Sequence, residues 1–182
     1  MRLFSALYPP DDVIAAIDAA VGERAGGLRW VPPHQWHVTL AFYGDVADDV
    51  VPDLGARLER AAAKSSAFSL RVSGAATFAR QAARARVVHA GLAGDVEQLT
   101  RLADRCSAAA RRVNIPVDDR KFRPHLTLGR ARLGSFDARE IVSRLSSYES
   151  AEWTVTSFRL VHSTLSASVT HTPLQEFALT KT

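Results

Sequence analysis

Two nearly identical tetrapeptides lie 88 residues apart in this 182-residue chain, His37-Val38-Thr39-Leu40 and His125-Leu126-Thr127-Leu128. Each follows a segment that contains proline, and each has the apolar, β-branched character of a strand. Because side chains of a strand alternate between its two faces, each tetrapeptide presents an imidazole and a hydroxyl on one face. Its two aliphatic side chains point the other way. A fold that brings both strands to one cleft would collect two histidines and two threonines there.

This set of groups suits the chemistry of a phosphate ester. One imidazole takes a proton from water while the other gives a proton to the leaving oxygen. Histidine is apt because its ordinary pKa of ~6.5 makes both protonation states accessible near neutrality. The hydroxyls of Thr39 and Thr127 can donate hydrogen bonds to the non-bridging phosphate oxygens. The residues alone do not decide which histidine is the acid and which the base.

A third His-x-Thr pattern occurs at His162-Ser163-Thr164. Its second residue is polar, so it lacks the aliphatic anchor that the other two have behind the strand. It also has no proline segment before it. We therefore interpret His162 as an ordinary strand residue and His37 and His125 as the functional pair.

The pattern of apolar residues predicts an α+β fold with mainly antiparallel sheet, because strands and helices mix without strict alternation. No low-complexity linker divides the chain, so residues 1–182 are predicted to form a single domain. Asp95 with Gln98 resembles a capping box, and Ser135 is placed to cap a helix that carries Ile141. The predicted strands are 2–8, 28–31, 36–43, 67–78, 85–92, 125–131, 152–163 and 170–179, and the predicted helices begin near residues 11, 48, 95 and 135.

The net charge and the cysteine content indicate which partners and which cellular compartment suit the protein. A net charge of +4 and a pI of about 9.7 favour anionic partners such as RNA or phosphate esters. The single cysteine, Cys106, excludes an internal disulfide and is predicted to be buried, which suits a reducing cytoplasm. No apolar run approaches the ~20 residues of a membrane span. Arg80, Arg84 and Arg86 either follow an RNA backbone or cover a solvated hairpin, and the sequence leaves both interpretations open.

No metal or organic cofactor is expected. No two histidines have the i, i+4 spacing of a helical metal site, and there is no glycine-rich nucleotide loop. Among the aromatic residues beside the motifs, Tyr43 and Phe122 are candidates for stacking on a base, whereas Phe42 is predicted to pack in the core. Trp30 and Trp36 are predicted to be structural.

The two motifs in their contexts resemble those of the 2H phosphoesterase superfamily, and in particular its RNA 2′,3′-cyclic phosphodiesterases, historically called 2′-5′ RNA ligases. The first context is Arg29-Trp30-Val31-Pro32-Pro33 leading to His37-Val38-Thr39-Leu40-Ala41-Phe42-Tyr43-Gly44. The second is Phe122-Arg123-Pro124-His125-Leu126-Thr127-Leu128-Gly129-Arg130. Weaker likeness covers the rest of the chain.

The resemblance implies a bilobal fold with pseudo-two-fold symmetry and a metal-independent site between the lobes. It further implies that His37 is the proton donor, that His125 is the proton acceptor, and that Thr39, Thr127 and Arg130 bind the phosphate. The substrate would be an RNA with a 2′,3′-cyclic phosphate end, and the protein would act as a monomer. One departure is visible, because His89 stands where the family commonly has tryptophan, which puts the base preference in question.

Three alternatives remain beside this hydrolase. The same site would serve a 2′-5′ RNA ligase, since ligation is the reverse reaction with a 5′-hydroxyl in place of water. It would also serve an esterase on a small cyclic nucleotide. A non-catalytic module that binds RNA ends belongs to a different class, and the intact pair of imidazoles argues against it because binding alone does not need two of them.

Overall fold

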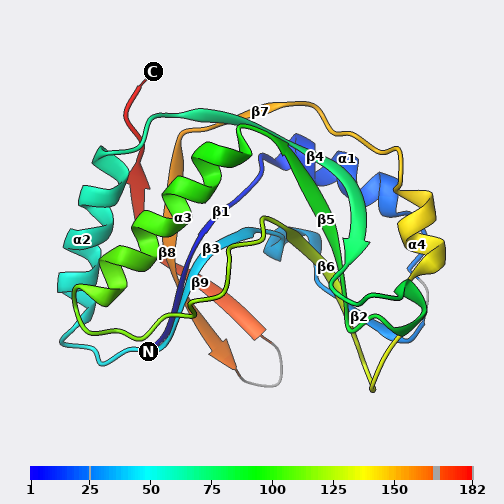
Figure 1. Cartoon of the computed structure of the whole chain (residues 1–182), viewed down its shortest axis with the longest axis horizontal. Helices are drawn as coiled ribbons and strands as arrows, with labels where there is room; N and C mark the ends of the chain where they lie inside the picture. Colours follow the sequence, from blue (N-terminus) through cyan, green and yellow to red (C-terminus); the bar gives the residue numbers. More distant parts are fainter. Residues whose placement is uncertain (25, 166–168, 182) are drawn as a thin grey trace.

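Two antiparallel sheets form the framework of the computed structural model, which describes residues 1–24, 26–165 and 169–181. The two sheets lie in different halves of the molecule (Figure 1), and the predicted α+β class is confirmed. In spatial order, the first sheet contains β3 (Val38–Asp45), β1 (Arg2–Leu7), β8 (Ser157–Leu165) and β9 (Val169–Ala178). The second contains β2 (Leu28–Trp30), β6 (Leu126–Ala131), β5 (Val87–Gly94), β4 (Phe68–Thr77) and β7 (Trp153–Val155).

Four helices cover these sheets. The helices α2 (Val51–Ala63) and α3 (Val96–Arg111) pack on each other and on the first sheet, whereas α1 (Asp11–Val21) and α4 (Arg139–Arg144) lie at the other end of the molecule (Figure 1). The helix α3 follows β5 of the second sheet but packs against β3 of the first. One hydrophobic core therefore draws residues from both sheets, and Cys106 on α3 is buried in it as predicted.

The two halves repeat one arrangement of strand pairs. The strand β1 pairs antiparallel with β3, which carries the first motif, and β5 pairs antiparallel with β6, which carries the second. The repeated motifs suggest two motif strands that lie side by side. They belong instead to different sheets and meet without pairing, since β3 is the edge strand beside β1 and β6 lies between β2 and β5.

A β-bulge occurs at the same place in both motif strands. In the first sheet Ala6 lies opposite Thr39 and Ser5 opposite Ala41, so Leu40 is the extra residue. In the second sheet His89 lies opposite Thr127 and Val88 opposite Gly129, so Leu128 is the extra residue. An extra residue reverses the alternation of faces beyond it. The side chain three positions after each threonine therefore returns to the face of that threonine, at Phe42 in the first motif and at Arg130 in the second.

The bulge corrects two predictions. Phe42 lies opposite Phe4, on the face of Thr39, and is 46% exposed, so it is not a core residue. Tyr43 is only 3% exposed, and its hydroxyl donates a hydrogen bond of 2.9 Å to the Ser5 hydroxyl. The interpretation of Tyr43 as a base-stacking residue is therefore wrong, because its ring is enclosed between the first sheet and α3.

Three predicted boundaries also differ from the structure. Asp95 precedes α3, but its carboxylate accepts from the backbone N–H of Ser69 and caps no helical N–H group. The helix predicted to begin at Ser135 begins only at Arg139, after Ala138. The predicted strand 152–163 is divided at Thr156 into β7 and β8, which belong to different sheets.

The buried hydrogen bond between Tyr43 and Ser5 provides a test of the corrected position of Tyr43. Replacement of Tyr43 with Phe should lower the free energy of unfolding by about 1–2 kcal/mol, because the buried Ser5 hydroxyl loses its partner. Urea denaturation would measure this change. Nucleotide binding by the variant should equal that of the wild type, and weaker binding without any loss of stability would contradict the core position.

Candidate active site

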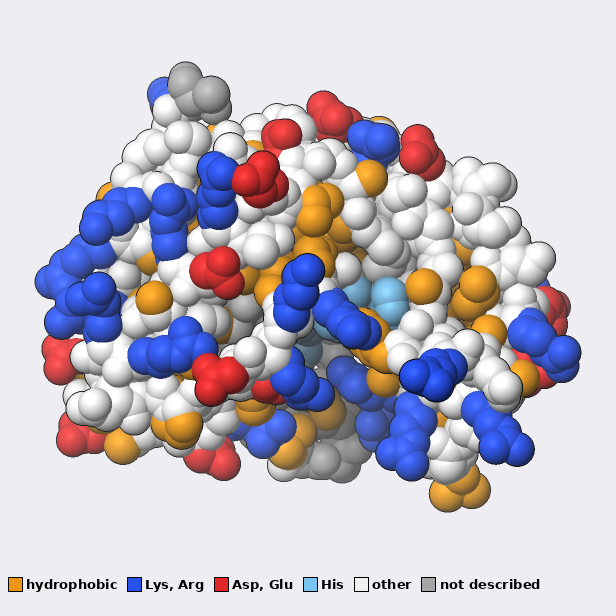
Figure 2. All heavy atoms as spheres, viewed as in Figure 1, with side chains coloured by type: hydrophobic (Ala, Val, Ile, Leu, Met, Phe, Trp, Pro, Cys, Tyr) orange, Lys and Arg blue, Asp and Glu red, His pale blue; other side chains and the backbone are white. Residues whose placement is uncertain are grey.

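The two motif histidines meet in a hollow between the halves of the molecule. Figure 2 shows histidine side chains at the bottom of this hollow and Lys or Arg side chains around its rim. His37 directly precedes β3 and His125 directly precedes β6. The positive charges of His125 and Arg130 both act on His37, which places these three residues near one another across the boundary between the sheets.

Each imidazole is held by the same backbone contact. Nδ1 of His37 lies 2.7 Å from the carbonyl oxygen of Gln35, and Nδ1 of His125 lies 2.7 Å from the carbonyl oxygen of Arg123. Since a carbonyl only accepts, both Nδ1 atoms carry a hydrogen and donate it. This contact fixes the tautomer, so Nε2 of each ring remains free to exchange a proton with a substrate.

Aromatic neighbours restrict each ring further. The ring of His37 lies 5.0 Å from that of Phe4, 5.2 Å from that of His171 and 5.6 Å from that of Tyr8. The ring of His125 lies 4.9 Å from that of Phe78 and 5.3 Å from that of His89. Each motif histidine is thus packed against one phenylalanine and a second histidine, which holds it in a defined orientation.

Burial and positive charge keep both imidazoles neutral at pH 7. Burial lowers the pKa of His37 to about 4, where the Gln35 carbonyl acts in the opposite sense and His171, His125 and Arg130 lower the pKa further. Burial also lowers the pKa of His125, again opposed by a carbonyl, that of Arg123, and assisted by Arg130. An anion between the two rings would offset these effects and favour protonation.

Groups suited to hold that anion line the same faces. Thr39 and Thr127 are half-buried, and neither hydroxyl makes a side-chain hydrogen bond within the described part of the chain. Arg130 lies opposite Val87, two residues before His89 on β5, so it shares the face of Thr127. Arg130 is exposed, and in residues 1–24, 26–165 and 169–181 no carboxylate forms an ion pair with it. Its guanidinium is therefore available for an external anion.

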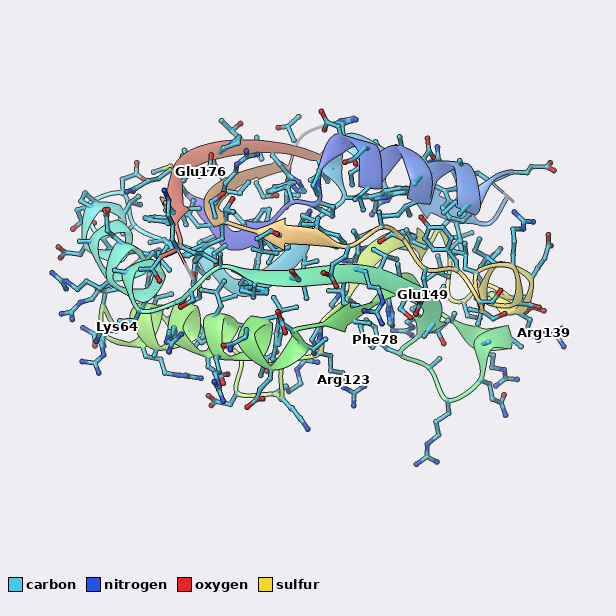
Figure 3. All side chains as sticks on the ribbon, turned by 90° about the horizontal axis from the view of Figure 1, so that it is seen from above. Lys64, Phe78, Arg123, Arg139, Glu149 and Glu176 are labelled. Atoms are coloured by element: carbon cyan, nitrogen blue, oxygen red, sulfur yellow. The ribbon has the colours of Figure 1, made fainter. Side chains whose placement is uncertain are left out.

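The other sequence candidates lie in different places. His162 faces away from the cleft, since it lies opposite Leu3, a core residue on the far face of β1. Phe122 is half-buried and packs against the main core. Arg80, Arg84 and Arg86 are exposed in the loop after β4. In Figure 3 the side chain of Arg123 points away from the ribbon, while its carbonyl holds His125.

His89, which departs from the usual tryptophan, takes part in the cleft. It is only 8% exposed, and its ring stacks on Phe78 at 4.4 Å and meets His125 edge-on. Burial lowers the pKa of His89 to about 4, and the charge of His125 acts in the same direction. At pH 7 a neutral imidazole therefore occupies this position and adds no charge beside His125.

Three cleft residues were missed by the sequence reasoning. Phe42 could have been found, because it follows Thr39 by the same three positions by which Arg130 follows Thr127. Phe78 and His171 carry no such signal, since they come from the end of β4 and from β9, and only the folded sheets bring them to the motif histidines.

Among the residues that the structure describes, no three His, Cys, Asp or Glu side chains gather as ligands for a metal ion. Within the same residues, no helix combines the length and the apolar character that a membrane span requires.

The family model described as the 2′-5′ RNA ligase superfamily matches residues 9–167. The chain belongs to this superfamily. It is 32% identical to an RNA 2′,3′-cyclic phosphodiesterase of Thermus thermophilus, over 98% of this chain and 90% of the relative. An RNA 2′,3′-cyclic phosphodiesterase of Archaeoglobus fulgidus is 30% identical over 91% of this chain and 92% of its own length.

Solved structures of the superfamily have the same fold. The crystal structure of TT0787 of Thermus thermophilus superposes with a TM-score of 0.82 at 32% identity, over 98% of both chains. The E. coli LigT structure complexed with 3′-AMP superposes with a TM-score of 0.77 at 28% identity, also over 98% of both chains. The resemblance inferred from the two motifs is thereby confirmed over nearly the whole chain.

The neutral state of the imidazoles can be measured by NMR titration of the ring protons. In the free protein His37 should titrate well below its ordinary range, near pH 4. Inorganic phosphate should raise its pKa, because the bound anion stabilises the imidazolium. His162 serves as the control, since it lies on the opposite face of the sheet and its ring signals should not move when phosphate is added. A His37 signal that is unaffected by saturating phosphate would contradict an anion site between the rings.

Proposed function

We propose that this protein hydrolyses the 2′,3′-cyclic phosphate at the end of an RNA to a 2′-phosphomonoester. The observation that carries the proposal is the pair of imidazoles, each tied through Nδ1 to a backbone carbonyl and each facing a cleft with Thr39, Thr127 and Arg130. The names of the relatives from Thermus thermophilus and Archaeoglobus fulgidus agree with this activity. The E. coli LigT structure complexed with 3′-AMP supports a nucleotide as the ligand.

The reaction follows from the positions of the two rings. Water attacks phosphorus in line with the departing ribose oxygen. Nε2 of His125 accepts the proton of the water as the new P–O bond forms, and Nε2 of His37 donates a proton to the 3′ oxygen as its P–O bond breaks. The resemblance to the family supplies this assignment of donor and acceptor. The Thr39 and Thr127 hydroxyls and the Arg130 guanidinium hold the non-bridging oxygens, where negative charge is concentrated.

Binding of the substrate promotes the protonation that the reaction needs and the free protein lacks. Both imidazoles are neutral in the free protein, whereas the reaction needs a protonated donor beside a neutral acceptor. The negative charge of the cyclic phosphodiester offsets the positive field of Arg130 and raises the affinity of the pair for one proton. Binding of substrate and uptake of a proton are therefore coupled.

Phe42 is the aromatic residue best placed to receive the terminal base. It shares the face of Thr39 and His37, its ring is 46% exposed, and the Arg2 guanidinium lies 4.7 Å from the ring centre. An exposed ring with a cation packed against one face presents a flat surface on which any base can stack. This role replaces the one that the sequence suggested for Tyr43.

The same geometry also serves ligation, in which a 5′-hydroxyl takes the place of water. The mechanism needs no ATP, because the strained cyclic ester supplies the driving force. Product analysis separates the two reactions. We expect the protein to work as a monomer of one catalytic domain in the cytoplasm, where a buried free thiol such as Cys106 remains reduced.

Removal of either imidazole should abolish the acid–base pair. With a short RNA that ends in a 2′,3′-cyclic phosphate, and with EDTA present, His37→Ala and His125→Ala should each lower kcat on the order of 10²–10⁴-fold. Thr39→Ala and Thr127→Ala should cost less, since each removes one hydrogen bond to phosphate. The matched control is His162→Ala on β8, whose side chain lies on the face of the first sheet opposite to the cleft and which should retain wild-type turnover. A loss with His162→Ala equal to that with His125→Ala, or activity that requires a divalent ion, would refute the mechanism.

The product should be a single isomer. With one histidine on each side of the phosphate, only one ribose oxygen faces the donor in a given pose. The assignment of His37 as donor to the 3′ oxygen predicts a pure 2′-phosphate, which phosphorus NMR against both standards would identify. A mixture of 2′- and 3′-phosphates would contradict the two-sided geometry, and a pure 3′-phosphate would reverse the pose of the ribose.

A further inference from the structure

A second hollow of about 430 Å³ lies beyond the end of β1, away from Phe42. In Figure 1 the start of α1 and the strand β7 are seen above the end of β1, and these segments form its walls together with the turn before β3. Its volume is in the range of ~300–1,000 Å³ that is typical of small-molecule sites. Its walls include Tyr8, His34, Trp36, Trp153, Thr156 and Arg159.

This hollow adjoins the catalytic cleft through Tyr8. The ring of Tyr8 lines the hollow and also lies 5.6 Å from the ring of His37. His34, three residues before His37, lines the hollow too and acts electrostatically on His171, whose ring packs edge-on against that of His37. A ligand held at His37 can therefore extend into the hollow without leaving the surface of the protein.

Phe42 and the hollow lie in opposite directions from His37 along β1. Phe42 is opposite Phe4, whereas Tyr8 is four residues further along the chain, which corresponds to roughly 13 Å of extended strand. The His37 ring contacts both Phe4 and Tyr8, so it lies between the two. A substrate centred on His37 can thus send one part toward Phe42 and another toward the hollow.

A ribonucleotide has this shape. The base is attached to C1′, next to the carbon that bears the 2′ oxygen. The link to the preceding nucleotide leaves through C5′, which is attached to C4′, next to the carbon that bears the 3′ oxygen. The base and the preceding nucleotide therefore leave the ribose in opposite directions. When the 3′ oxygen faces His37 and the base lies on Phe42, the strand continues toward Tyr8.

The walls of the hollow offer groups that a nucleotide can use. The Arg159 guanidinium lies 5.4 Å from the centre of the Tyr8 ring, which creates a flat cationic and aromatic surface. Thr154, Thr156 and Ser157 add hydroxyl groups to the lining, of which that of Ser157 already donates a hydrogen bond to Glu176.

The charges around the hollow favour a base over a bare phosphate. Arg159 is partly neutralised by Glu176, whose carboxylate lies 3.4 Å from its Nε, and Asp11 lines the hollow as well. A base needs a flat surface and a few hydrogen bonds, and it does not need a net positive charge. The hollow supplies both the flat surface and the hydrogen-bonding groups.

From these contacts we infer that the hollow is a subsite for the penultimate nucleotide, which precedes the nucleotide that carries the cyclic phosphate, with its base held between Tyr8 and the wall formed by Thr154, Thr156 and Ser157. The inference rests on the proposed function, because it takes an RNA 2′,3′-cyclic phosphate as the substrate. It predicts that the protein prefers RNA ends at least two nucleotides long to a free cyclic nucleotide.

The test compares two substrates and three proteins. The substrates are adenosine 2′,3′-cyclic phosphate and the dinucleotide ApA with the same cyclic end. The proteins are the wild type, Thr156→Trp, which fills the hollow from an exposed position, and Ser147→Trp, which adds the same bulk at an exposed residue outside it. The measured quantity is the ratio of kcat/KM for the dinucleotide to kcat/KM for the mononucleotide.

In the wild type this ratio should be about 10, the gain expected from one stacked base. Thr156→Trp should lower the ratio to about 1 by weakening the dinucleotide only, and Ser147→Trp should leave it at the wild-type value. A wild-type ratio near unity, or equal losses on both substrates with Thr156→Trp, would overturn the subsite while leaving the hydrolase intact. No turnover of either substrate by the wild type would instead overturn the proposed function.

Discussion

One extra residue in each motif strand decides which side chains reach the cleft. Without the bulges at Leu40 and Leu128, strict alternation would carry Phe42 and Arg130 to the core face, where a guanidinium has no partner. With them, each motif presents three groups to the cleft. The two sets differ only in the third member, which is an aromatic ring in one half and a cation in the other. The near-symmetric fold therefore produces an asymmetric site, with a surface for a base on one side and a charge for a phosphate on the other.

The electrostatics of the cleft depend on this arrangement. The two half-buried imidazoles lie beside a guanidinium in one hollow, and burial and the charge of Arg130 lower the pKa of both imidazoles. Such a set is poorly solvated until an anion enters it. A cyclic phosphodiester brings one negative charge between the two rings and beside Arg130, so binding and the creation of the acid occur together. The backbone carbonyls of Gln35 and Arg123 contribute by keeping the exchanging proton on Nε2 of each ring.

Much of this could be predicted from the sequence because the determinants are local. The order of strands and helices follows from apolar periodicity, and the motif histidines follow from a repeated tetrapeptide. The errors share one cause, since each depends on a contact with a distant strand. The bulge that exchanges the faces of Phe42 and Tyr43 is set by pairing with β1. The carboxylate of Asp95 is taken by the backbone of Ser69, so the expected capping box does not form. His171 and Phe78 enter the site only because β9 and the end of β4 lie beside the motif histidines.

The matched environments of the two histidines bear on the direction of the reaction. After one hydrolysis the proton resides on His125, and His37 is neutral, which is the protonation state that the reverse reaction requires. Each ring has a backbone carbonyl, a phenylalanine and a second histidine beside it, but the pKa of His37 is lowered by two neighbouring histidines as well as by Arg130, whereas Arg130 alone has this effect on His125. A further bias comes from the nucleophile. Water is present in large excess over any RNA 5′-hydroxyl, and the two subsites, at Phe42 and in the hollow beside Tyr8, hold the strand on only one side of the cyclic phosphate. A cleft that binds the end of one RNA and leaves the approach to His125 open to solvent favours hydrolysis, although the reaction is reversible.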